Sequence, residues 1–355
     1  MSKQIDTLKS GVPALLSWYN RVRRPLPFRE APTPYRVWVS EIMLQQTRIE
    51  AVLPHFAAFM AAFPTVSDLA NADDEHLLKL WEGLGYYSRA KNLKKAAIEI
   101  CKTYGGELPA DFEQLRALSG IGDYTAGAIA SIAYGLPVPA VDGNVLRVFS
   151  RLLCYDTDVL STKGRRELTE AVKAVLPPDA PGAFNEAVME LGETVCLPNT
   201  APLCDSCPLA AVCAAHNAGR ETDFPVRIKK NARRVENRTV LVAIQDKKVL
   251  LCKRPEKGLL AGLYELPNIE GAGDANALAA AFGLTLESAP QPLPYAKHLF
   301  SHVEWRMTGF SATVSGNAPA NGRFVTAEEL KNDTALPSAF KVYGKLLPAL
   351  LEGQI

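Results

Sequence analysis

The fold of the first half of the chain is decided by the stretch Leu118-Ser119-Gly120-Ile121-Gly122-Asp123-Tyr124. Apolar residues at helical spacing precede it, and a second helical run follows over residues 125–134. Two glycines one residue apart let the backbone turn tightly and point its N–H groups outward at the start of the next helix. The stretch therefore predicts a glycine hairpin at which a phosphate can dock, with an ordinary helix–helix turn as the alternative.

An acidic residue follows this hairpin. Val141-Asp142-Gly143-Asn144 precedes another helical pattern, which contains Val145, Val148 and Leu152. Asp is a favoured N-cap, so capping alone would explain Asp142. An acid at the start of the next helix is also what a catalytic helix-hairpin-helix motif requires. Both interpretations of Asp142 stay open at this point.

Four cysteines lie within eighteen residues with the spacing C-x7-C-x2-C-x5-C, namely Cys196, Cys204, Cys207 and Cys213. Cysteines of an apolar core occur singly rather than in such a group. The spacing therefore predicts a metal or cluster site. Four thiolates suit tetrahedral zinc as well as a [4Fe–4S] cluster, and the spacing does not separate the two.

Length and composition predict a two-domain globular protein. The chain has 355 residues, of which 48% are hydrophobic and 22% charged, and its net charge is +1. No apolar run reaches the roughly 18 residues that cross a bilayer, and the first ten residues do not resemble a signal peptide. Clustered cysteines are typical of a reducing compartment. We expect a cytoplasmic, nucleoid-associated protein without a membrane partner.

The sequence pattern changes along the chain, which predicts an α+β multidomain protein. Residues 1–216 have helical periodicity, residues 217–237 read as an exposed basic linker, and residues 238–355 form an α+β domain. The linker is either a solvated connector or a phosphate contact. In the last domain we expect strands at 239–244, 249–252 and 302–314, a turn at Lys247-Lys248, and helices at 275–282 and 340–351.

The order of hairpin, Asp-Gly-Asn and clustered cysteines resembles the endonuclease III superfamily of DNA glycosylases, and most closely its MutY-type adenine DNA glycosylases. Residues 37–47 (VWVSEIMLQQT) look like that family's catalytic-helix signature, and residues 83–89 (GLGYYSR) look like its DNA-wedge loop. The resemblance covers nearly the whole chain. It implies an all-α helix-hairpin-helix glycosylase core with an iron–sulfur subdomain, followed by a Nudix-like α+β domain.

Glu41 is the expected general acid. It lies in an apolar helical stretch with Val37, Trp38 and Leu44 three or four positions away, so its carboxyl group should be poorly solvated. Burial raises the pKa of a carboxyl group. Adenine leaves its sugar readily only after a ring nitrogen is protonated, which a carboxylic acid protonated near neutral pH can do. A surface position on an amphipathic helix is the alternative for Glu41.

The resemblance implies roles for three more residues. Ionised Asp142 would stabilise the oxocarbenium character of the sugar, while Tyr124 and Asn144 would assist. A transient covalent adduct to Asp142 and direct attack by water both remain open. Bifunctional relatives carry a Schiff-base lysine at the position of Tyr124, so we expect a monofunctional enzyme that leaves an abasic site.

The resemblance also implies how DNA is held. The target base must leave the duplex, and the gap must be filled. The residues that match the family's DNA contacts are Gln46, Leu84, Tyr86 and the hairpin glycines Gly120 and Gly122. Core aromatic packing is the alternative for Tyr86.

For the cysteines, the resemblance favours a [4Fe–4S] cluster held by Cys196, Cys204, Cys207 and Cys213. The family commonly has six residues between its first two ligands, whereas this chain has seven. One extra loop residue adds little closure entropy, so the assignment is kept.

The last domain resembles the Nudix-like domain of these glycosylases, above all at residues 258–267 (GLLAGLYELP). A Nudix hydrolase needs metal-binding glutamates on a helix, and the helix at 276–282 has none. Recognition of 8-oxoguanine is therefore the expected role, through Phe300, Ser301 and His302. An incidental β-turn is the alternative for these three residues.

We therefore expect a base-excision repair enzyme that removes adenine opposite 8-oxoguanine or guanine in double-stranded DNA. Its alternatives are a bifunctional endonuclease III-like glycosylase/lyase and a catalytically silent lesion-binding protein. We expect a monomer. A sliding clamp is a conceivable partner on which the sequence gives no information.

Overall fold

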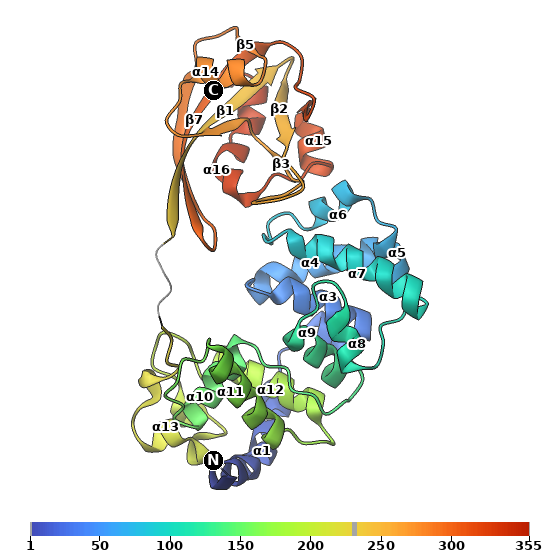
Figure 1. Ribbon diagram of the computed structural model, residues 1–355, viewed down its shortest axis with the longest axis vertical. Helices are drawn as coiled ribbons and strands as arrows, with labels where there is room; N and C mark the ends of the chain where they lie inside the picture. The colour runs from blue at the N-terminus through green and yellow to red at the C-terminus, as the bar shows by residue number, and fades with distance from the viewer. Residues whose placement is uncertain (1, 229–232, 355) are drawn as a thin grey trace. The chain divides into compact units, whose positions relative to one another are not determined.

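The computed structural model describes residues 2–228 and 233–354, and these divide into two compact units (Figure 1). The first unit comprises residues 1–71 and 92–230, and the second comprises residues 72–91 and 231–355. The second unit therefore contains a short segment from the middle of the helical half. No helix in the described ranges combines the length and apolar character needed to span a membrane.

The first unit is all-helical, as the sequence predicted. Its helices are α1 (Ser2–Val22), α2 (Pro27–Glu30), α3 (Pro34–Leu44), α4 (Ile49–Ala62), α5 (Val66–Ala70), most of α7 (Ser88–Tyr104), α8 (Phe112–Ala117), α9 (Asp123–Ala128), α10 (Gly143–Leu152), α11 (Thr162–Val175), α12 (Pro181–Thr194) and α13 (Ala214–Asn217). Short polar residues cap several of them: Asp111, Asp142 and Ser161 each accept a bond from a backbone N–H three residues on.

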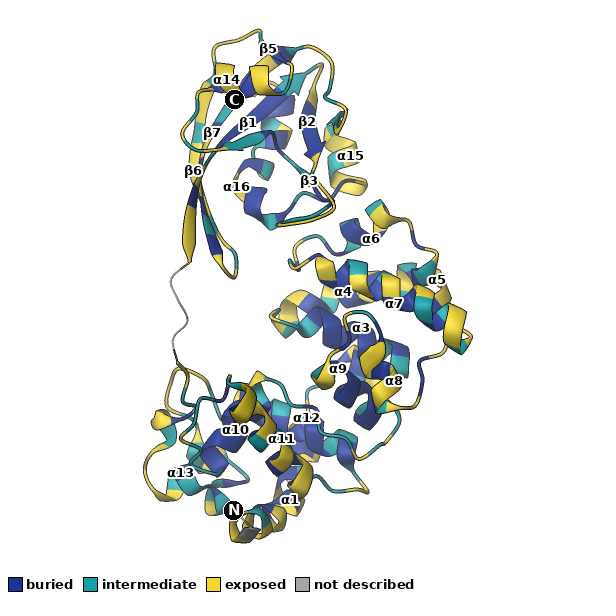
Figure 2. Cartoon of the chain, viewed as in Figure 1, coloured by how far each residue is buried: buried dark blue, intermediate teal, exposed yellow. Residues whose placement is uncertain are grey.

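One core of this unit lies between α1, α10, α11 and α12. Leu15, Phe149, Val172 and Phe184 come from these four helices and are almost fully buried. Figure 2 shows the alternation of buried and exposed residues that such packing produces. Because the burial of each large apolar side chain contributes roughly 1.5–3 kcal/mol, this core holds the helices in fixed relation to one another.

The helical run expected at residues 125–134 is present but changes its winding. Helix α9 continues as a π-helical turn over Ile129–Ala133. At Gly127, a Cβ atom would lie 2.3 Å from the carbonyl oxygen of Pro139, so only glycine allows the segment before Asp142 to approach α9.

The second unit is built on a mixed eight-stranded sheet of order β3-β2-β1-β7-β5, in which β4 pairs with β1, β6 with β7 and β8 with β2. Strands β1 and β7 are parallel, and the other pairs are antiparallel. The strands are β1 (Arg234–Gln245), β2 (Lys248–Lys253), β3 (Tyr264–Glu265), β4 (Asn268–Glu270), β5 (Thr285–Leu286), β6 (Gln291–Leu299), β7 (Val303–Ser315) and β8 (Gly322–Val325).

Helices lie on both faces of this sheet (Figure 1). On one face, α14 (Ala275–Ala281) packs Leu278 against Leu241. On the other, α16 (Lys341–Gly344) and α17 (Leu347–Leu351) pack against Trp305. The unit also contains α6 (Asp74–Leu80) and α15 (Ala327–Asn332).

The turn, the linker and the last helix differ from expectation, and the helix expected at 340–351 is divided into α16 and α17. The hairpin turn predicted at Lys247-Lys248 is at Asp246-Lys247, whose φ angles are +49° and +59°. Asp tolerates this left-handed conformation better than most residues, which explains the shift by one position. In addition, β1 begins at Arg234, inside the range expected to be linker, and Phe224 in that range is buried.

Candidate active site

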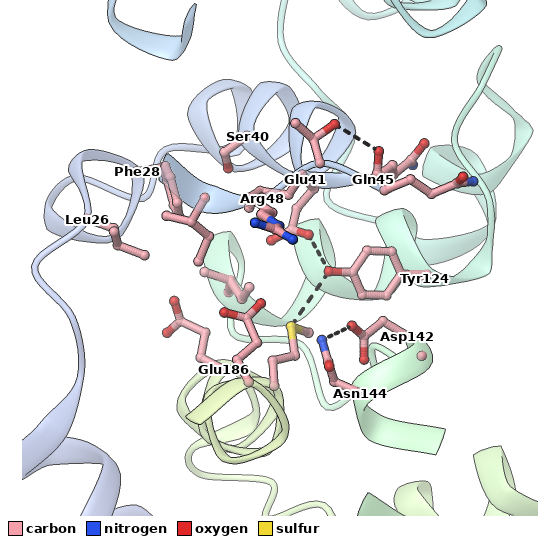
Figure 3. A pocket seen from close by; sticks show the side chains of 18 of the residues that line it. Leu26, Phe28, Ser40, Glu41, Gln45, Arg48, Tyr124, Asp142, Asn144 and Glu186 are labelled. Carbon is pink, nitrogen blue, oxygen red and sulfur yellow. Dashed lines mark hydrogen bonds between the residues drawn. The ribbon is translucent and has the colours of Figure 1, made fainter. Parts of the chain in front are cut away.

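A cavity of about 980 Å³ in the first unit lies between α3, α9, α10 and α12. Glu41, Tyr124, Asp142 and Asn144, which the sequence singled out as catalytic candidates, all line this cavity (Figure 3). They come from three helices that are distant in the sequence. The fold therefore brings two carboxyl groups, a phenol and an amide to one chamber.

Glu41 has the poorly solvated environment that its sequence context predicted. It lies on α3, whose start is fixed by the Thr33 cap and Pro34, and only 7% of it is exposed. The Tyr124 hydroxyl donates a hydrogen bond to Glu41 Oε2. Burial raises the pKa of Glu41 to about 7, the Tyr124 bond opposes that rise, and the nearby Asp142 charge adds to it.

Asp142 is both an N-cap and a wall of the cavity. Its Oδ1 accepts a bond of 2.7 Å from the backbone N–H of Val145, and its Oδ2 accepts one of 2.8 Å from Asn144 Nδ2. Burial raises the pKa of Asp142, whereas these donors and the Arg147 guanidinium lower it. Capping thus does not exclude catalysis, because Oδ2 still faces the other site residues.

The backbone before Asp142 is fixed by Asn185 on α12. Its side chain accepts a bond of 3.1 Å from Ala140 N and donates one of 2.9 Å to Val138 O. Arg147 then holds Asn144, because its NH2 donates to Asn144 Oδ1 at 2.8 Å and its Nε donates to the Cys196 carbonyl at 2.8 Å. The site's polar groups are therefore positioned by buried side chains rather than by flexible loops.

The sequence did not reveal the acidic group on α12. Glu186 points into the cavity (Figure 3) and forms an ion pair with Arg29 at 3.4 Å. Arg29 also binds Glu190 at 2.8 Å, and Arg24 reaches Glu190 as well. Acids at 186, 190 and 193 share the spacing of an ordinary solvated helix face. No local signal in the sequence marks Glu186 as a site residue, because its partner Arg29 lies 157 positions away.

The glycine hairpin has the backbone that its sequence predicted. Gly120 has φ +76°, and a Cβ atom there would lie 2.6 Å from Asn92 Cβ. Gly122 is the residue before α9, has open space where a side chain would be, and lines a second cavity of about 690 Å³ next to Tyr124. A phosphate contact at Gly120 and Gly122 stays a prediction.

The residues expected to contact the DNA bases are divided between the units. Gln46 is exposed in the first unit just after α3, with φ +57°. In the second unit, Leu84 is buried, whereas Tyr86 is 47% exposed with φ +47°. Arg89 donates to the carbonyl oxygens of Leu84 and Gly85 at 2.9 and 3.0 Å, and so holds this loop.

The predicted recognition residues form a turn between β6 and β7, in which Phe300 N donates to Val303 O at 2.8 Å. Ser301 and His302 are exposed, while the Phe300 ring packs edge-on against Trp305 at 5.0 Å. Ser301 Oγ lies 3.1 Å from the Tyr86 hydroxyl. Within the second unit, the fold therefore brings the wedge loop and the recognition turn together.

The four clustered cysteines line one cavity, whose other walls include Leu152, Leu191 and Val195. All four are free of disulfides. Arg151 NH1 donates to Cys196 Sγ at 3.1 Å. Within the described ranges, no three of the four sulfurs lie within 4.8 Å of one another, whereas a tetrahedral zinc ion holds its sulfurs roughly 3.8 Å apart.

Comparisons with known proteins match both parts of the chain. Residues 39–178 match the HhH-GPD superfamily of base excision DNA repair proteins, and residues 239–345 match the NUDIX domain. The adenine DNA glycosylase of Rattus norvegicus is 35% identical over 93% of this chain and 77% of its own length. That of Homo sapiens is 33% identical over 96% of this chain and 75% of its own length.

Among solved structures, a thermostable thymine-DNA glycosylase is similar to 60% of this chain. The match covers 98% of that protein, with 25% identity and a TM-score of 0.55. A trapped endonuclease III–DNA covalent intermediate gives 23% identity and a TM-score of 0.52. These likenesses concern the fold of the helical part.

Proposed function

Because this chain belongs to the adenine DNA glycosylase family, we propose that it excises adenine that is mispaired with 8-oxoguanine or guanine in double-stranded DNA. The protein is a base-excision repair glycosylase that hydrolyses an N-glycosidic bond. Family membership does not specify the opposite base, the catalytic residues or the mechanism, which we propose from the site. The observation that carries it is the buried Glu41, bonded to Tyr124 and sharing one cavity with Asp142.

Glu41 is the general acid in this mechanism. An extruded adenine in the cavity receives the Glu41 proton on a ring nitrogen as its bond to the sugar C1′ breaks, and the bonding electrons leave with the base. A carboxyl group with a pKa of about 7 is protonated in much of the protein near neutral pH. A fully ionised carboxylate has no proton to give.

Asp142 is the anionic partner. It accepts bonds from two donors, Val145 N and Asn144 Nδ2, which favour its charged form, while Glu41 accepts one from Tyr124. The Asp142 charge disfavours ionisation of Glu41, so the proton resides on Glu41 while Asp142 keeps its charge. The Asp142 charge then stabilises the positive sugar, to which water finally adds, either directly or after a covalent adduct.

The chain is monofunctional. A lyase reaction needs an amine that forms a Schiff base with the opened sugar. In the described part of the chain, the cavity wall contains arginines but no lysine, and the position after Asp123 holds Tyr124, whose hydroxyl is bonded to Glu41. Adenine release should therefore leave an intact abasic site.

Glu186 supports recognition of adenine. Its carboxylate, held by Arg29, faces the cavity and can accept a hydrogen bond from an exocyclic amino group. Guanine and thymine present a carbonyl oxygen where adenine presents this amine. The carboxylate would repel that oxygen, which favours adenine.

The second unit supports recognition of the opposite base. Its sheet belongs to the NUDIX class, and the turn at Phe300, Ser301 and His302 presents two polar side chains at the surface. An 8-oxoguanine differs from guanine by an N–H at N7 and an oxygen at C8, and a serine hydroxyl can accept from that N–H. Tyr86, beside Ser301, has the exposed ring that a wedge between bases needs.

Cys196, Cys204, Cys207 and Cys213 would hold a [4Fe–4S] cluster. All four cysteines line one cavity, and within the described ranges no three of their sulfurs lie within 4.8 Å of one another, which suits a cluster larger than one zinc ion. When bound, the cluster would supply structural cross-linking. Arg147 and Arg151 would orient the Cys196 end of the loop through the Cys196 carbonyl and sulfur.

The decisive test is Glu41→Gln in the full-length protein. Single-turnover release of adenine from a duplex with adenine opposite 8-oxoguanine, detected as alkali-sensitive sites, should fall by about 10²–10⁴-fold. The exposed Glu107→Gln should act as wild type. Unchanged adenine release by Glu41→Gln would refute the role of Glu41 as the general acid. Efficient borohydride trapping of the wild type would show a Schiff base and refute a monofunctional enzyme.

A further inference from the structure

The segment Ala72–Lys91 is separated from the rest of the second unit by the 139 residues 92–230, yet it packs within that unit. It contains α6 and the wedge loop that carries Tyr86. Its polar side chains contact β3, β8 and the chain that follows α15. In the sequence, the loop that carries Tyr86 lies between the residues that make these contacts.

Glu75 on α6 makes the first set of contacts. Its Oε2 lies 2.9 Å from Arg323 NH2 on β8, and its Oε1 accepts a bond of 3.3 Å from the Tyr264 hydroxyl on β3. The Arg323 guanidinium lies 4.6 Å above the Tyr264 ring and also donates to Thr334 Oγ1 at 2.9 Å. Arg323 thus joins α6, β3 and the segment after α15 in one cluster.

Lys79 and Glu82 make the second set. Lys79 Nζ donates to Glu82 Oε2 at 2.7 Å and to the carbonyl of Leu330 at 2.8 Å, in the last turn of α15. Glu82 Oε1 in turn accepts a bond of 2.8 Å from Leu336 N. The Lys79 side chain is only 15% exposed, so these bonds are poorly screened by solvent.

Lys91 makes the third contact, beyond the wedge loop. Its Nζ donates to Glu256 Oε2 and to the carbonyl of Ala261, each at 3.1 Å. Gly262, whose φ of +66° favours glycine, leaves room for the Lys91 ammonium, because a Cβ atom there would lie 2.4 Å from Lys91 Nζ. The loop with Tyr86 is therefore anchored on both sides, by Glu75, Lys79 and Glu82 before it and by Lys91 after it.

We propose that these contacts form a latch that positions the Tyr86 loop against the Ser301 turn, so that the loop and the turn form one ordered surface that binds the lesion. The latch consists of Glu75, Lys79, Glu82 and Lys91 with their partners. This inference rests on the proposed function for the role of Tyr86 and Ser301. Its residues are positioning residues, because they act on the lesion through the loop.

An ordered Tyr86 loop explains why the latch affects the preference for adenine opposite 8-oxoguanine over adenine opposite guanine. A loop that is already ordered in its binding conformation loses less conformational entropy when it binds. Tyr86 OH and Ser301 Oγ lie 3.1 Å apart, and the latch residues hold the loop in this conformation. An undocked loop would have to find the Ser301 turn during each encounter.

The test uses charge reversal in the full-length protein. Arg323→Glu and Glu75→Arg each place like charges together, whereas the double variant restores an opposite pair. Glu328→Arg, exposed on α15, is the matched control. We expect the single variants to lower the preference for adenine opposite 8-oxoguanine over adenine opposite guanine about fivefold, the range of a partly exposed pair. The double variant should recover most of it.

Hydrogen–deuterium exchange provides the second readout, which does not depend on the lesion. The amides of Leu84 and Arg89 are bonded to the Trp81 and Tyr86 carbonyls, so they report on the order of the loop. These two amides should exchange faster in the single variants than in wild type. In the double variant and in the control, they should exchange at the wild-type rate. Unaltered exchange in Arg323→Glu overturns the latch.

The two readouts separate the latch from the proposed function. If wild type shows no preference for the lesion, the proposed lesion specificity fails, while exchange still decides whether the latch orders the loop. If Arg323→Glu loosens the loop but keeps the full wild-type preference, the latch has no role in reading and the inference is wrong. Loss of preference without rescue in the double variant also overturns it.

Discussion

The cavity of the first unit surrounds the carboxyl groups of Glu41 and Asp142, whereas the turn at residues 300–302 of the second unit presents its polar groups at the surface. Glu41 accepts a bond from Tyr124, Asp142 accepts bonds from Asn144 and the Val145 backbone, and burial raises the pKa of both carboxyl groups. Ser301 and His302 are exposed, and their position depends on the backbone of a turn. Substitutions in the first unit should therefore change the rate of the chemistry, and substitutions in the second should change the choice of substrate.

The largest effect should come from Asp142→Asn. Asparagine caps a helix as well as aspartate does, so α10 and the fold should persist. The negative charge of Asp142 is lost, and the single-turnover rate should fall by about 10²–10³-fold with either 8-oxoguanine or guanine opposite the adenine. A rate within tenfold of wild type, with thermal unfolding unchanged, would contradict the electrostatic role of Asp142.

The pH dependence of the single-turnover rate tests Glu41. Its raised pKa means that the acid is protonated below about pH 7 and loses its proton above it. The rate should therefore fall as pH rises through about 7, approaching tenfold per pH unit beyond that point. The same limb should appear with guanine and with 8-oxoguanine opposite the adenine; a limb that depends on the opposite base would place the titrating group in the second unit.

Tyr124→Phe sharpens this assignment. The Tyr124 hydrogen bond lowers the pKa of Glu41, so its removal should raise that pKa and move the falling limb toward higher pH. A bond to a charged acceptor is worth about 1.5–3 kcal/mol, which corresponds to a shift of roughly one to two pH units. The full pH–rate profile of the variant measures it. A shift toward lower pH would show that Tyr124 acts in another way.

The smallest effect should come from Ser301→Ala. Loss of one hydrogen bond at an exposed site costs about 1 kcal/mol, or roughly fivefold in the rate ratio between the two duplexes. The rate with 8-oxoguanine opposite should fall more than the rate with guanine opposite. Competition between the two duplexes in one reaction measures the ratio. Equal losses on both would remove Ser301 from lesion recognition.

The structural predictions that the fold confirms rest on local sequence patterns. The hairpin glycines, the buried helix around Glu41 and the strands of the second unit each have a signature within a few residues. Long-range pairings have none. Glu186 looked like a residue of a solvated helix face, and Arg323 meets Glu75 across 248 positions. For the same reason the sequence did not indicate that residues 72–91 pack within the second unit.

Arg89 and Trp81 hold the Tyr86 loop through its carbonyl oxygens at Leu84 and Gly85. Such bonds do not depend on the side chain at position 86, so they should persist when Tyr86 is replaced. The side chain itself adds a contact with the Arg89 guanidinium, which lies 5.8 Å from the centre of the Tyr86 ring. The φ angle of +47° at position 86 disfavours β-branched residues, which limits the side chains that this loop can present to DNA.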